Sequence, residues 1–147
     1  MKNLFQRIKH RKFVYTQPFQ HIVYRNLINL EEFDRLYENM HYFNGPRWTN
    51  WKKEYGLDCE LFDDVSKINY DNECMALWFF TDRNERSAKN DVEIYSARTG
   101  GRKVVTRWAN ELLFFEHNHK QQIRLLKRDK NWSTIKRPVV QLSLIHI

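Results

Sequence analysis

The chain has 147 residues, of which 41% are hydrophobic, 29% charged and 15% aromatic, with few glycines and prolines. This composition excludes a disordered or low-complexity protein. The length predicts one domain over residues 1–147. It has no run of the roughly 20 apolar residues that span a bilayer and no apolar signal core in MKNLFQRIKHRKF, so we expect a cytoplasmic protein without a membrane partner. The formal charge of +7 is concentrated in a basic segment, residues 1–12, and in residues 120–137, which indicates either a solvated surface or contact with nucleic acid or an acidic protein.

The first third of the chain predicts two strands and a helix. Residues 13–28, FVYTQPFQHIVYRNLI, mix β-branched and aromatic residues on both sides of Pro18, which is typical of two strands around a turn. Asn29 follows as a helix N-cap, with Glu32 in the capping-box position. The helix continues to residue 40 on apolar residues at helical spacing, namely Leu30, Phe33, Leu36 or Tyr37, and Met40. Residues 47–66 indicate a covering segment or a short helix.

From residue 67 onward the pattern is that of strands. The predicted strands are MALWFF, DVEIYSA, RKVVTRW, NELLFFEH opened by Asn110, QQIRLL and RPVVQLSLI, with a turn at TGG (99–101). One early helix followed by a series of short strands predicts a sandwich or barrel that is packed by a helix. Cys59 and Cys74 form no disulfide framework and no CxxC motif, so we expect both thiols to be reduced.

The last six residues, LSLIHI (142–147), match the in-frame translation of a common transposase-adapter end, CTGTCTCTTATACACATC. We therefore expect residues 142–147 to be non-native and the natural C-terminus to be missing, and we assign no function to His146. The alternative stays open, because VVQLSLI also has the composition of a strand.

Several familiar chemistries lack their motifs in this sequence. There is no GxSxG, no Walker loop and no GxGxxG, and TGGRK lacks the spacing of a phosphate loop. Glu60, Asp63 and Asp64 indicate a solvated acidic face. His117 and His119 are too few for a zinc site, which needs three or four ligands.

Four segments in order carry a resemblance to a known family. QPFQHIVYRNLINLEEFDRLYENM resembles an opening strand and helix, ALWFFTD a strand of the type LLYYLN, NELLFF a strand of the type NRLVLF, and RPVVQLSL a closing RxSLxL strand. Together they resemble the iron- and 2-oxoglutarate-dependent dioxygenases, especially the prolyl-hydroxylase-like group. The resemblance covers nearly the whole chain and implies a double-stranded β-helix, or jelly roll, in a mainly β protein with an N-terminal helix.

The resemblance also implies a set of site residues. The family holds Fe(II) with an HxD pair and a distal histidine, and a basic residue on the closing strand binds 2-oxoglutarate. The HxD pair corresponds to Asn69-Tyr70-Asp71, and the co-substrate residue to Arg137, with Lys136 beside it. For the distal histidine three positions remain open.

The best register for the distal ligand places Gln121 where the histidine belongs, a bulge of two residues would supply His119, and His117 is the third choice. The implied metal set is therefore Asn69, Asp71 and His119. Asn69 departs from the family, because an amide oxygen is a weaker ligand for Fe(II) than imidazole.

Two functions follow as expectations. The first is a dioxygenase-like protein that, if it is active, hydroxylates a peptidyl side chain such as proline with Fe(II) and 2-oxoglutarate. The second is a non-catalytic jelly-roll module that binds nucleic acid or a protein through its basic ends and exposed aromatics such as Trp48, Trp51 and Trp132. In the second case Asn69 and Asp71 belong to a strand-entry turn whose side chains bond to nearby backbone groups.

Overall fold

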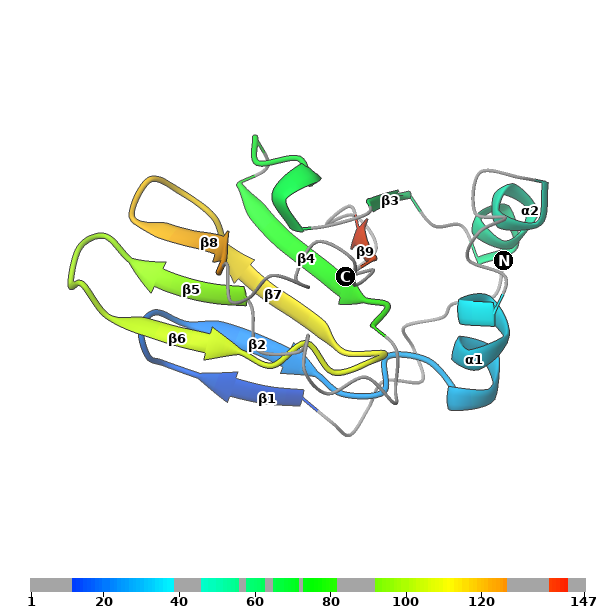
Figure 1. Cartoon of the computed structure of the whole chain (residues 1–147), viewed down its shortest axis with the longest axis horizontal. Coiled ribbons are helices and arrows are strands. Elements are labelled where there is room, and N and C mark those ends of the chain that lie inside the picture. The colour runs from blue at the N-terminus through cyan, green and yellow to red at the C-terminus, as the bar shows by residue number, and fades with distance from the viewer. Residues whose placement is uncertain are drawn as a thin grey trace.

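A computed structural model describes residues 12–38, 46–55, 58–62, 65–71, 73–81, 92–126 and 138–142. These residues form a mainly β structure of two antiparallel sheets with helices at one end (Figure 1). In spatial order the six-stranded sheet contains β1 (Lys12–Tyr15), β2 (His21–Tyr24), β7 (Leu112–Glu116), β4 (Cys74–Phe79), β9 (Val139–Leu142) and β3 (Cys59–Phe62). The three-stranded sheet contains β6 (Arg102–Val105), β5 (Val92–Ser96) and β8 (Gln121–Leu125).

The predicted N-terminal elements are confirmed. β1 and β2 pair as an antiparallel hairpin, and α1 (Leu30–Glu38) follows directly. The side chain of Asn29 caps this helix, because its Oδ1 accepts a hydrogen bond from the Glu31 N–H at 2.8 Å. The predicted end of the helix, residues 39–45, lies outside the described residues.

The segment that was ambiguous in the sequence contains three short elements. They are α2 (Pro46–Tyr55), the edge strand β3 and a 3-10 turn, η3 (Val65–Lys67). Trp48 on α2 is only 6% exposed and packs in the core. The expectation that Trp48 is an exposed aromatic is therefore wrong, since the helix turns this ring toward the sheet. The side chain of Trp51 and residue Trp132 lie outside the described part.

The six predicted C-terminal strands are all present, as β4 to β9. β4 has the continuous apolar sequence CMALWF because both of its faces are covered. β9 ends at Leu142, which pairs with Cys59 of β3. Leu142, the first of the six residues that we expected to be non-native, is thus part of a paired strand. Residues 143–147 lie outside the described residues. Cys59 and Cys74 are free thiols in the structure.

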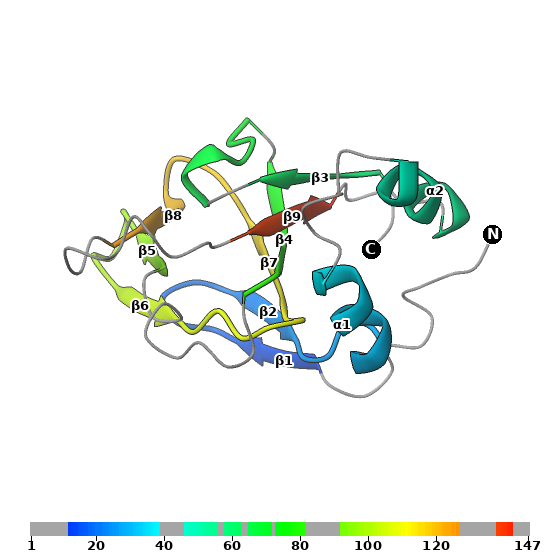
Figure 2. The ribbon, with the colours of Figure 1, turned by 45° about the vertical axis from the view of Figure 1, so that its right-hand side comes forward.

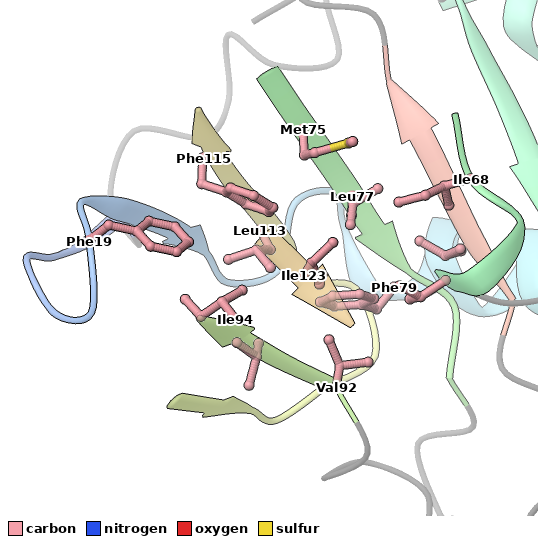
Figure 3. Packing of buried hydrophobic residues seen from close by; sticks show 13 residues of the cluster. Phe19, Ile68, Met75, Leu77, Phe79, Val92, Ile94, Leu113, Phe115 and Ile123 are labelled. Atoms are coloured by element: carbon pink, nitrogen blue, oxygen red, sulfur yellow. The ribbon is translucent and has the colours of Figure 1, made fainter. Parts of the chain in front are cut away.

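The six-stranded sheet separates two hydrophobic cores. The outer core lies between this sheet and the helices, which Figure 2 shows toward one end of the strands. Its buried members are Leu27, Ile28, Phe33, Trp48, Cys59, Ala76, Trp78, Phe80, Leu112, Val140 and Leu142. The inner core lies between the two sheets. Its buried members are Phe19, Val65, Ile68, Met75, Leu77, Phe79, Val92, Ile94, Val105, Leu113, Phe115, Ile123 and Val139, and those labelled in Figure 3 point toward one another from both sheets.

One buried amide joins the outer core to the strands. Asn110 precedes β7 with φ +65° and is fully buried. Its Oδ1 accepts hydrogen bonds from the Trp78 indole at 3.1 Å and the Ile28 N–H at 3.3 Å, and its Nδ2 donates to the Ile28 carbonyl at 2.8 Å. Asn110 therefore joins the β2–α1 connection to the centre of the sheet.

Candidate functional site

The residues at the implied HxD position form a turn just before β4. The Asp71 N–H donates a hydrogen bond to Asn69 Oδ1 at 2.9 Å, which is the geometry of an Asx turn. The side chains of Asn69 and Asp71 are exposed, whereas Tyr70 is half-buried and its hydroxyl donates to the Val65 carbonyl at 2.7 Å. The turn is thus stabilised by its own side chains.

A buried glutamine from the closing strand holds this turn in place. The Asn69 N–H donates to Gln141 Oε1 at 2.8 Å, and Gln141 Nε2 donates to the Asn69 carbonyl at 2.9 Å and to Met75 Sδ at 3.5 Å. Gln141 is 6% exposed and lies on β9. Sequence reasoning missed this residue, although a polar side chain within the apolar run VVQL was a visible signal.

The three candidates for the distal histidine lie at different places around the β7–β8 turn. The backbone N–H of His117 donates to the Glu73 carbonyl at 2.6 Å, and the His117 ring centroid is 5.8 Å from that of Tyr70. The ring nitrogen Nε2 of His117 lies 3.2 Å from Gln122 Oε1. His117 is therefore the imidazole beside the 69–71 turn.

His119 and Gln121 have other surroundings. His119 is exposed in the turn between β7 and β8. Gln121 begins β8, and its Nε2 donates to the Glu116 carbonyl at 2.7 Å. Lys136 and Arg137, the implied co-substrate residues, lie outside the described residues.

The described residues do not fit an Fe(II) centre. Asn69 Oδ1 already accepts the Asp71 N–H, and His117 Nε2 faces an amide oxygen. In the described part of the chain, no group of three or more His, Cys, Asp or Glu side chains is placed to hold a metal ion. A facial triad needs three such donors on one side of the metal.

A second group of residues lies on β1 and β6 and just after β2, and we call it the β1–β6 edge: Lys12, Phe13, Val14, Arg25, Arg102, Lys103 and Val104. Phe13, Val14 and Val104 are 39%, 53% and 41% exposed. The Arg25 guanidinium lies 4.5 Å from the centre of the Phe13 ring, and Lys103 Nζ lies 3.5 Å from the centre of the Tyr15 ring. The edge therefore combines exposed apolar side chains with cations that already lie over aromatic rings.

Glu111 is the carboxylate that pairs with this edge. Its Oε1 lies 3.3 Å from Arg25 Nε, and the Glu111 side chain is only 9% exposed. Burial raises the pKa of Glu111 to about 7, and the nearby Arg25 offsets only part of this effect. The Glu111 carboxyl is therefore only partly ionised near neutral pH.

Comparison with known proteins gives no match to a family model and no match to a curated protein. None of the helices in the described ranges is both long enough and apolar enough to cross a bilayer. The fold and its geometry define a mainly β, two-sheet protein with a helical layer, and they leave the family resemblance as a prediction.

Proposed function

We propose that this chain has the double-stranded β-helix fold of the iron- and 2-oxoglutarate-dependent dioxygenases and works without an iron centre, as a binding module for single-stranded nucleic acid. The observation that carries the proposal is the use of Asn69 as a turn residue. Its side chain bonds to Asp71, and its backbone bonds to Gln141. In this chain, the residue at the position that a dioxygenase uses for a metal ligand stabilises a turn instead.

The order of the strands supports the proposed fold. After β4 in the six-stranded sheet the chain forms β5 and β6 in the other sheet, then returns for β7, crosses again for β8 and returns for β9. This repeated crossing between two antiparallel sheets is typical of a jelly roll. The η3 turn contacts β8, where a further strand of the smaller sheet would lie.

The packing between the sheets supports the absence of catalysis. A jelly-roll enzyme needs space and polar groups between its sheets for the metal and co-substrate. In this chain, apolar side chains from both sheets meet there (Figure 3), and Leu77, Ile94 and Val139 are 0% exposed. Gln141 also faces this core, but its amide is engaged by Asn69.

The charge of the β1–β6 edge supports nucleic acid as the partner. Lys12, Arg25 and Arg102 are exposed there, and the whole chain carries a formal charge of +7. Proteins that bind single-stranded nucleic acid combine cations, which contact the phosphates, with exposed aromatic rings, on which the bases stack. Phe13 with Arg25 above it supplies the ring.

The first experiment tests for a metal centre. We expect the melting temperature of the protein, measured anaerobically, to be unchanged by Fe(II) with 2-oxoglutarate, and no succinate to form, because the donors do not converge. An active dioxygenase would instead show a thermal shift that Asp71→Ala abolishes. That result would overturn the non-catalytic part of the proposal.

The second experiment tests the partner and its surface. We expect the protein to bind a labelled oligothymidine in fluorescence anisotropy, with an affinity that falls as salt rises. Lys12→Gln and Arg102→Gln should each lower the slope of log K against log salt by about 0.7, the value for one phosphate contact of a single strand. Lys53→Gln removes the same charge from an exposed position on α2 and should leave the slope unchanged. Absence of binding refutes the function, whereas equal slopes in all variants refute only the surface.

A further inference from the structure

A buried histidine and a lysine connect the two sheets at the β1–β6 edge. His21 lies on β2 in the six-stranded sheet and is 1% exposed. Lys103 lies on β6 in the three-stranded sheet, and its Nζ is 3.2 Å from His21 Nε2. Since no hydrogen-bonded strand pairing joins β6 to β2, this side-chain contact bridges the gap between the sheets.

The hydrogen bonds determine which nitrogen of His21 carries the proton. His21 Nδ1 lies 2.9 Å from the Phe19 carbonyl, which can only accept, so Nδ1 carries the proton. Nε2 is then an acceptor for the Lys103 ammonium, which also lies over the Tyr15 ring at 3.5 Å. The contact therefore needs a neutral imidazole and a charged lysine.

We propose that His21 and Lys103 form a pH-sensitive latch that holds the edge of the three-stranded sheet against the β1–β2 hairpin. Protonation of Nε2 removes the acceptor and places two cations 3.2 Å apart in a partly buried site. The latch is closed when His21 is neutral and opens when His21 is protonated.

Among the described residues, the groups that face His21 are aromatic rings and Lys103, and none of them would neutralise the second charge. From β1 it faces Tyr15, whose ring stacks on it at 5.0 Å, and from the turn it faces Phe19. Its register partner on β7 is Phe115, and the charged group facing it from β6 is Lys103. Within the described residues no carboxylate forms an ion pair with Lys103 or His21.

The direction of the pH dependence follows from burial. Desolvation lowers the pKa of His21 from its ordinary value, with Lys103 acting in the same direction and the hydrogen bond to Phe19 against it. The opened form binds a proton near the ordinary pKa of about 6.5, so the closed form is fully favoured above that pH and loses stability as the pH falls below it.

Apolar contacts also lie at this corner of the two sheets. A Cβ on Gly101, in the β5–β6 turn, would lie 3.1 Å from the Pro18 Cβ in the β1–β2 turn, so the two turns meet in a close apolar contact. Phe19 beside it is buried against Phe115 at a ring distance of 5.5 Å. Opening the latch would therefore expose the Phe19 end of the inner core.

Amide hydrogen exchange of the free protein at pH 7.5 and 5.0, corrected for intrinsic rates, tests the latch without any ligand. We expect protection of β1, β2 and β6 amides to fall roughly tenfold more than that of β4 and β9 on acidification, because only the first group is released. His21→Gln should abolish this difference, since its amide oxygen still accepts from Lys103 but does not titrate.

Lys103→Met separates the effect of the Lys103 charge on His21 from the effect of the burial of His21. The variant should reduce the pH effect at β1, β2 and β6 and raise the pKa of His21 measured by NMR, while Lys53→Met should change neither. Equal loss of protection in all strands of the wild-type protein would overturn the proposal. The same holds if His21→Gln keeps the full pH effect.

Discussion

Two amide side chains in this protein make the same pair of hydrogen bonds in different surroundings. Asn110 binds both the N–H and the carbonyl of Ile28, and Gln141 binds both the N–H and the carbonyl of Asn69. Each amide thus makes the pair of hydrogen bonds that a residue of a neighbouring strand would make, and it connects a loop to a segment that is distant in sequence. The two loops differ in their access to water, because Ile28 is 5% exposed and Asn69 is exposed.

This difference in solvent access determines what each amide contributes to stability. If Asn110 is removed, the backbone of Ile28 and the Trp78 indole lose these hydrogen bonds inside the outer core. If Gln141 is removed, the backbone of Asn69 can bond to water instead. A buried polar group left without a partner costs about 1–3 kcal/mol, whereas an exposed one costs much less.

The largest expected effect is that of Asn110→Ala. Three hydrogen bonds would be lost in the outer core, and alanine would have to adopt φ +65°. We expect the free energy of unfolding to fall by about 4 kcal/mol, measured by urea denaturation.

Asn110→Gly and Asn118→Ala are the controls for this prediction. Glycine accepts the positive φ, so the glycine variant should recover about 1 kcal/mol of the loss. Asn118 is a half-exposed turn residue whose Oδ1 accepts from the Lys120 N–H, and its replacement should cost about 1 kcal/mol. A loss at Asn110 no larger than that at Asn118 would contradict the role of burial.

A smaller effect is expected for Gln141→Leu. The leucine would pack against Met75 in the inner core, while the Asn69 backbone turns to water, so we expect a loss of about 1 kcal/mol in urea denaturation. Exchange of the Asn69 amide should rise in the same variant. If the loss equals that of Asn110→Ala, solvent access does not explain the difference between the two amides.

The smallest effect extends the comparison to a charged group beside Asn110. Glu111 has a pKa raised to about 7, so the folded protein holds its proton between about 4.5 and 7, and stability from this group is lost as the pH rises through 7. Glu111→Gln should raise the melting temperature by about 3 °C at pH 8.5 and have almost no effect at pH 5. An effect of the same size at both values would show that the carboxyl titrates normally.

The class of fold could be predicted because its signals are local. Alternation and β-branched residues predicted the β1–β2 hairpin and strands β4 to β9, and Asn29 predicted the start of α1. β3 was missed because CELF is a short edge strand next to an acidic stretch, and it forms only through pairing with β9. The exposure of Trp48 was mispredicted because the orientation of α2 depends on tertiary packing.

The candidate site was predictable in position and not in its contacts. The sequence placed Asn69 and Asp71 before β4 and favoured His119 as the distal ligand, whereas the histidine beside Tyr70 is His117, the third choice. It did not indicate that Gln141 would hold Asn69, 72 residues away. The His21–Lys103 contact has a separation of 82 residues and was equally invisible.

The sequence by itself determined the mainly β class and the helix that begins after Asn29, because each depends on neighbours within a few residues. Only the tertiary structure decided that Asn110 and Gln141 connect distant segments, and that a histidine on one sheet meets a lysine on the other. These contacts arise where two sheets and a helical layer close on one another, and their energies depend on the exclusion of water, which no local pattern encodes.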